Sequence, residues 1–103
     1  MKFLCICQYG HSPSAALVRV FHSLKHEAVA VGVGTSPSAI EVIGDWADHI
    51  CVMQPHFANY VPDRLKHKVA VFDVGHDQWS NPYNQDLLTI LRSMADQFLK
   101  EKQ

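Results

Sequence analysis

The side chains best placed to do chemistry lie between Cys5 and Ser14, directly after the first apolar run of the chain. Cys5 ends that run, five residues follow, and Ser12-Pro13 then opens a stretch with helical periodicity. Backbone N–H groups in such an arc, together with the positive end of the helix dipole, form a cradle for phosphate or a similar oxyanion. The same field is expected to lower the pKa of the Cys5 thiol, and Ser12 can both cap the helix and donate a hydrogen bond to the thiolate. The segment therefore predicts an oxyanion-binding loop with a cysteine nucleophile.

The rest of the chain predicts the scaffold that holds this loop. Apolar runs over 1–5, 28–33, 50–53 and 69–74 are typical of buried strands. Helices are expected from Ser12 to about His26, from a capping box at 38–41, as a short helix or turn over 55–65 interrupted by Pro62, and along a C-terminal stretch whose apolar face carries Leu87, Leu91, Met94 and Phe98. Strands that are apolar on both faces indicate a three-layer α/β fold, with a four-stranded parallel sheet between helices. Ligands of such sheets bind at the carboxyl ends of the strands, which is where the loop after Cys5 is expected.

Length and composition narrow the classes of function. The 103 residues are expected to form one domain, 1–103, with enough apolar side chains for a core without disulfides or metal. Nine Lys and Arg residues against ten Asp and Glu leave a net charge of -1 and no basic stripe, which argues against nucleic acid as a partner. The apolar runs are too short for a membrane span and lack the pattern of a signal peptide, so we expect a cytoplasmic protein without a membrane partner.

Three cysteines and seven histidines invite the question of a metal or a disulfide. In a reducing compartment, an odd number of cysteines indicates free thiols rather than a disulfide framework. Cys51 is expected in the core, and Cys7 is a candidate redox partner for Cys5. The histidines, including His22 and His26 one helical turn apart, form no four-ligand set with the spacing of a zinc site. Neither a metal nor a cofactor is therefore expected.

The loop resembles that of the low-molecular-weight protein tyrosine phosphatases. That family carries Cys-x5-Arg-Ser-Pro directly after its first strand, and this chain reads Cys5-x5-His11-Ser12-Pro13 at the same place. The family also has a general-acid Asp in an Asp-Pro-Tyr or Asp-Pro-Trp loop before its final helix, where this chain has Asp77-Gln78-Trp79. The segment 47–53 looks like the family's third strand, so the resemblance extends over nearly the whole chain.

The resemblance implies a fold, an activity and a set of site residues. The strand order would be 2-1-3-4, and the protein would hydrolyse phosphate monoesters, phosphotyrosine among them, on a phosphorylated small molecule or phosphoprotein. Cys5 would attack phosphorus and form a cysteinyl-phosphate, Asp77 would act as general acid and then base, and Ser12 would stabilise the thiolate. The implied phosphate- and substrate-binding residues are Gln8, Tyr9, Gly10, His11 and Trp79.

The departure from the family is His11, which stands where the family pattern has Arg. A guanidinium supplies a permanent charge and a planar fork for two phosphate oxygens, whereas imidazole is only partly charged near neutral pH. Activity is therefore expected to be weak or absent, and two alternatives stay open. One is a non-catalytic module that binds phosphate or a phosphopeptide. The other is a phospho-carrier like the IIB components of the cellobiose-type sugar phosphotransferase system, which use Cys-x5-Thr-Ser without Arg but need no general acid.

Overall fold

The computed structural model describes residues 1–9, 12–75, 79 and 81–102. Its strands are β1 (Lys2–Cys7), β2 (Glu27–Gly32), β3 (His49–Val52) and β4 (Val69–Val71), and its α-helices are α1 (Ser14–Ser23), α2 (Pro37–Trp46) and α3 (Gln85–Glu101). Two short 3-10 helices, η1 (Pro55–Tyr60) and η2 (Asp63–Lys68), connect β3 to β4, and Pro62 separates them as the sequence predicts.

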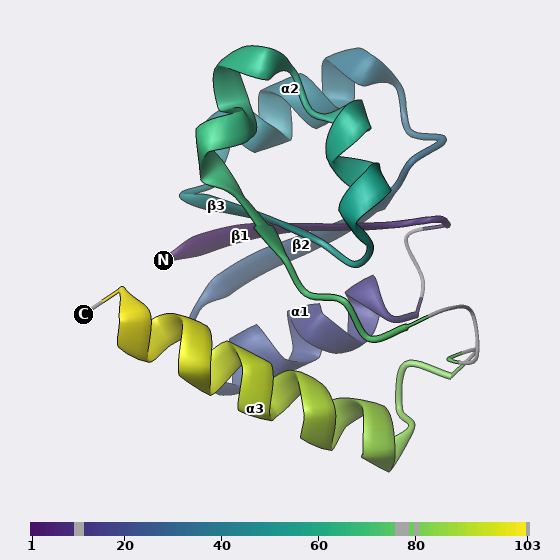
Figure 1. The fold of residues 1–103 in the computed structure, drawn as a ribbon, viewed down its shortest axis with the longest axis vertical. Coiled ribbons are helices and arrows are strands. Elements are labelled where there is room, and N and C mark those ends of the chain that lie inside the picture. Colours follow the sequence, from purple (N-terminus) through teal and green to yellow (C-terminus); the bar gives the residue numbers. More distant parts are fainter. Residues whose placement is uncertain (10–11, 76–78, 80, 103) are drawn as a thin grey trace.

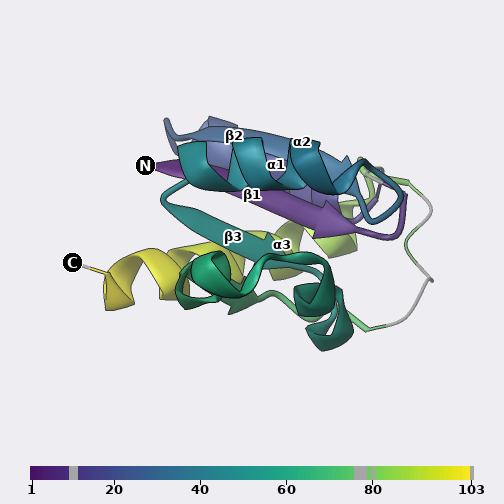
Figure 2. The ribbon, with the colours of Figure 1, turned by 90° about the horizontal axis from the view of Figure 1, so that it is seen from above.

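The four strands form one parallel sheet in the order β2-β1-β3-β4, so the predicted strand order is confirmed. Helices α1 and α3 cover one face, while α2 and the two 3-10 helices cover the other (Figure 1). Figure 2 shows the molecule from above, so that the layers overlap and α2 lies in front of the strands. Strand β1 lies between β2 and β3. Its carboxyl end is therefore flanked by the carboxyl ends of two neighbouring strands.

Strand β1 continues two residues further than predicted. Ile6 pairs with Val31 on one side and with Val52 on the other, and Cys7 pairs with Gly32. The backbone hydrogen bonds to β2 and β3 thus continue past Cys5, because buried N–H and C=O groups of the backbone need hydrogen-bond partners. Strand β4, by contrast, ends at Val71 rather than at residue 74.

The helix ends also correct the sequence reading. Helix α1 begins at Ser14, so Ser12 does not cap it, and it ends at Ser23 rather than near His26. At that end Lys25 has φ of 70°, and the His26 N–H donates to the Phe21 carbonyl, which is the hydrogen bond of a Schellman motif. The N-cap of α2 is Ser36, whose hydroxyl accepts from the Ala39 N–H at 3.2 Å, two residues before the predicted capping box.

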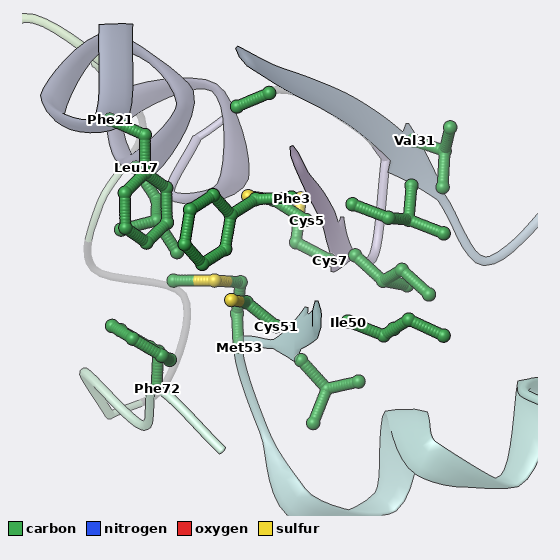
Figure 3. Close-up of a cluster of buried hydrophobic side chains, with 14 of the residues drawn as sticks. Phe3, Cys5, Cys7, Leu17, Phe21, Val31, Ile50, Cys51, Met53 and Phe72 are labelled. Atoms are coloured by element: carbon green, nitrogen blue, oxygen red, sulfur yellow. The ribbon is translucent and has the colours of Figure 1, made fainter. Parts of the chain in front are cut away.

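The core lies on both faces of the sheet. On the side of α1 and α3, Phe3 stacks on Phe21 with ring centroids 3.7 Å apart and contacts Phe98 edge to face. Figure 3 shows Phe3, Phe21 and Met53 on that side of the strands and Val31 and Ile50 on the other. Among the described residues, none of the helices combines the length and the apolar character that a membrane span requires. This packed scaffold holds the loop after β1 at the carboxyl end of the central strand.

Candidate active site

A small cleft lies at the carboxyl end of β1, and three segments that are distant in sequence line it. The loop after β1 supplies Cys7, Gln8, Tyr9, Ser12 and Pro13; the end of β3 and the start of η1 supply Met53, Gln54 and Phe57; and the segment after β4 supplies Gly75 and Trp79. Five of the residues singled out from the sequence are thus described here, of which Gln8, Tyr9, Ser12 and Trp79 line this cleft and Cys5 does not. The other three, Gly10, His11 and Asp77, lie outside the described residues.

Cys5 occupies the middle of β1 instead of its end. It pairs with Ala30 and Cys51, and its side chain has no exposed surface. Burial raises the pKa of the Cys5 thiol well above its ordinary value, and the neighbouring Cys51 and Cys7 act in the same direction. The expected lowering of this pKa is therefore wrong, because the thiol lies inside the sheet and not in the field of the loop. Such a thiol is poorly placed to attack a substrate.

Cys7 is the cysteine that stands at the end of β1 and lines the cleft. Its Sγ lies 2.8 Å from the Oγ of Ser14, and the two groups share a buried hydrogen bond. Ser14 is the first residue of α1, so the thiol faces the positive end of that helix dipole. Either group can be the donor in this hydrogen bond. Cys7 and Ser14 thus form the arrangement that the sequence analysis assigned to Cys5 and Ser12.

The spacing of the family pattern fits from Cys7 as well. Counted from this cysteine, Cys-x5-Arg-Ser-Pro reads Cys7-x5-Pro13-Ser14-Ala15. The serine matches, while Pro13 stands in the place of Arg and Ala15 in the place of Pro. Because Cys5 precedes Ser12 by the same seven residues that separate Cys7 from Ser14, the sequence offered two equivalent pairs. The residues that sequence reasoning missed are Cys7, Pro13 and Ser14. Both cysteines are buried, at 0% and 2% exposed, so what distinguishes the register is that Cys7 lines the cleft and contacts Ser14.

Ser12 lines the cleft beside Pro13, and their peptide bond is cis. The Oγ of Ser12 is buried and has no hydrogen-bond partner among the residues that the structure describes. No side chain caps the first turn of α1, because its N-cap residue is Pro13. Ser12 is therefore neither the helix cap nor the partner of the thiol.

The far wall of the cleft is held by hydrogen bonds to the backbone. The indole N–H of Trp79 donates to the carbonyl of Val74 at 2.8 Å, which orients the half-buried ring. The N–H of Gly75 donates to Oδ1 of Asp73 at 2.9 Å, and Gly75 has φ of 88°, a conformation that favours glycine. On the near side, Tyr9 is 77% exposed and stands at the mouth.

The cleft has little charge. None of its described lining residues is Lys, Arg, Asp or Glu. Within the same described ranges, no three His, Cys, Asp or Glu side chains come close enough together to hold a metal ion. What this part of the cleft offers a ligand is a thiol, hydroxyls, the side-chain amides of Gln8 and Gln54, a helix amino terminus and aromatic rings.

No protein-family model and no curated protein matches the chain, whereas solved structures match it in fold. Wzb of Vibrio vulnificus in complex with benzylphosphonate has a TM-score of 0.72 at 16% identity, over 97% of both chains. The solution structure of a low-molecular-weight protein tyrosine phosphatase from Bacillus subtilis has a TM-score of 0.72 at 17% identity, over the whole of both chains. A mutant of the YwlE arginine phosphatase with a phosphorylated active-site serine has a TM-score of 0.69 at 17% identity, over 97% of both chains. The chain therefore has the fold of these phosphatases, as its sequence predicts.

Proposed function

We propose that this protein is a cysteine-dependent, phosphatase-like protein that takes phosphate monoesters at the Cys7 cleft and forms a cysteinyl-phosphate on Cys7. The observation that carries the proposal is the 2.8 Å contact between Cys7 Sγ and Ser14 Oγ at the amino end of α1. Two structures of the same fold support it, because one holds benzylphosphonate and another carries a phosphorylated active-site serine. The partner would be a phosphorylated small molecule or a phosphoprotein.

The reaction would take place in two steps. The Cys7 thiolate, held by the Ser14 hydroxyl and the α1 dipole, attacks phosphorus, so that an S–P bond forms while the bond to the leaving oxygen breaks. Asp77, which we assign from the resemblance, gives its proton to that oxygen. Asp77 then accepts a proton from water as the water oxygen attacks phosphorus and the S–P bond breaks. Phosphate leaves, and Cys7 returns to its thiolate.

Pro13 limits the rate of this chemistry. The family pattern places a guanidinium here, which holds two phosphate oxygens as negative charge develops on them. Proline has no side-chain donor, and loss of one such donor costs an enzyme ~10²–10³ in turnover. Turnover by this protein is therefore expected to be slow. The same residue favours a second candidate function, namely a module that binds a phosphorylated ligand without hydrolysing it.

Hydrolysis of p-nitrophenyl phosphate by the wild type and three variants tests the proposal. We expect slow hydrolysis by the wild type, none by Cys7→Ser, and at least a ~10²-fold gain for Pro13→Arg, which restores Cys-x5-Arg-Ser. The matched variant His11→Arg adds the same side chain two residues earlier and is expected to give no comparable gain. Thermal unfolding of each variant establishes that it is folded.

Each alternative predicts a different outcome in this assay or in a measurement beside it. Hydrolysis that survives Cys7→Ser removes Cys7 from the mechanism, and a gain for His11→Arg alone restores the register that begins at Cys5. Binding of phosphate without hydrolysis, even after Pro13→Arg, favours the binding module. A stable phosphoryl label on Cys7, transferred from a phosphorylated donor protein, identifies a carrier instead.

A further inference from the structure

The Oγ of Ser12 is a buried polar atom that the fold itself leaves without a hydrogen-bond partner among the described residues. Buried hydroxyls are almost always paired, because an unpaired one has lost its contact with water and gained nothing in return. An exception at a cleft suggests that the partner comes from outside the chain. The other serines around the site differ from it, since the Ser14 hydroxyl is already engaged with Cys7.

The surroundings of Ser12 indicate the chemistry of the missing partner. Ser12 lines the same cleft as Cys7 and precedes the amino end of α1, whose first turn has no side-chain cap. The dipole of this ten-residue helix favours a negatively charged group at that end. No Lys or Arg is among the described lining residues, so an anion there would be held by neutral donors, and Ser12 supplies one of them beside the amides of Gln8 and Gln54.

We propose that Ser12 is a substrate-binding residue whose hydroxyl donates a hydrogen bond to an oxygen of the bound phosphoryl group. This inference rests on the proposed function and assigns Ser12 a different role from the one that the sequence suggests. Ser14 stabilises the sulfur, and Ser12 contacts the oxyanion. In a site where Pro13 supplies no side-chain donor, the neighbouring hydroxyl takes over part of the oxyanion contact. It does so without charge, so it supports binding better than it supports the charge of a transition state.

Substitutions at the two serines separate these roles. Ser12→Ala is expected to weaken the binding of orthovanadate and of inorganic phosphate by about tenfold or more, the effect of losing a hydrogen bond to a charged group. It should leave the Tm of the ligand-free protein unchanged or raise it, because the hydroxyl has no partner to lose. Ser12→Thr retains the hydroxyl and is expected to retain binding. Ser14→Ala should instead slow the alkylation of Cys7 by iodoacetamide, which Ser12→Ala should not.

The experiment consists of calorimetric titration with orthovanadate and with phosphate, thermal unfolding, and alkylation, each compared with Ser38→Ala on the exposed start of α2. Equal affinities of Ser12→Ala and Ser38→Ala for both anions would overturn the inference while leaving the proposed function intact. A Tm that falls for Ser12→Ala but not for Ser38→Ala would overturn it too, because it would reveal an internal partner. Absence of any binding by the wild type would overturn the proposed function together with the inference.

Discussion

Cys7 and Cys5 are two residues apart, yet the structure predicts very different reactivities for their thiols. Cys7 lines the cleft and keeps 2% of its surface exposed, whereas Cys5 has no exposed surface and pairs with strands on both sides. A reagent in water can reach Cys5 only when the central strand separates from its neighbours, which amounts to unfolding the domain. Unfolding typically costs at least about 5 kcal/mol, so Cys5 should be exposed in at most ~10⁻³ of the molecules. The raised pKa of Cys5 slows its reaction further.

Alkylation of the native protein by iodoacetamide measures this difference directly. We expect Cys7 to be labelled at least ~10 times faster than Cys5 or Cys51, because even its 2% exposure exceeds the ~10⁻³ fraction in which unfolding exposes the other two thiols. Each site is followed by mass spectrometry of peptides. Orthovanadate should protect Cys7 if the anion binds beside it. The Cys7→Ser variant should remain unlabelled while folded and should take up label at Cys5 and Cys51 in urea.

Comparable labelling of Cys5 and Cys7 in the folded wild type would refute the reasoning, since it would mean that Cys5 is accessible without unfolding. Rapid labelling of Cys5 in folded Cys7→Ser would have the same meaning. The control in urea shows that Cys5 and Cys51 can react and be detected, because both thiols must be labelled once the chain is unfolded.

Two further predictions concern the scaffold. The Nζ of Lys68 lies 3.0, 3.3 and 2.8 Å from the carbonyl oxygens of residues 44, 45 and 47, at the end of α2 where such groups lack helical partners. We expect Lys68→Met to lower the free energy of unfolding by about 1–2 kcal/mol. Lys66→Met is the control and should change it little, because the ion pair between Lys66 and Asp63 is exposed. Equal Tm values for the two variants would contradict this prediction. His49 lies between two phenylalanine rings, and its pKa is lowered, mainly because burial disfavours the imidazolium. Below pH 6.5 the unfolded chain therefore binds a proton at His49 more readily than the folded chain does. The contribution of the neutral, buried His49 to the free energy of unfolding is present above pH 6.5 and declines below it. Urea unfolding at pH 7.5 and 5.5 should show a smaller loss for His49→Gln than for the wild type, and an equal loss would count against the assignment.

Much of the architecture could be predicted from local patterns of the sequence. Apolar runs without alternation indicate strands buried on both faces, and such strands need helices on both sides. Pro62 interrupts the segment between β3 and β4 as expected, and Leu87 and Leu91 mark the buried face of α3. The helix ends were less predictable, since Lys25 adopts a positive φ that its residue type does not signal.

The sequence by itself determined the fold class and placed a thiol and a hydroxyl, seven residues apart, around the loop after the first strand. It did so twice over, with Cys5 and Ser12 and again with Cys7 and Ser14. Only the tertiary structure distinguishes the two pairs, because the end of β1 depends on partners far away in the chain. Val31 and Val52 extend the sheet beyond Cys5, which places that thiol in the middle of the strand and makes Cys7, itself 2% exposed, the last residue of β1 beside Ser14. Strand length is decided by hydrogen-bonding neighbours, and no local pattern in the first fourteen residues contains them.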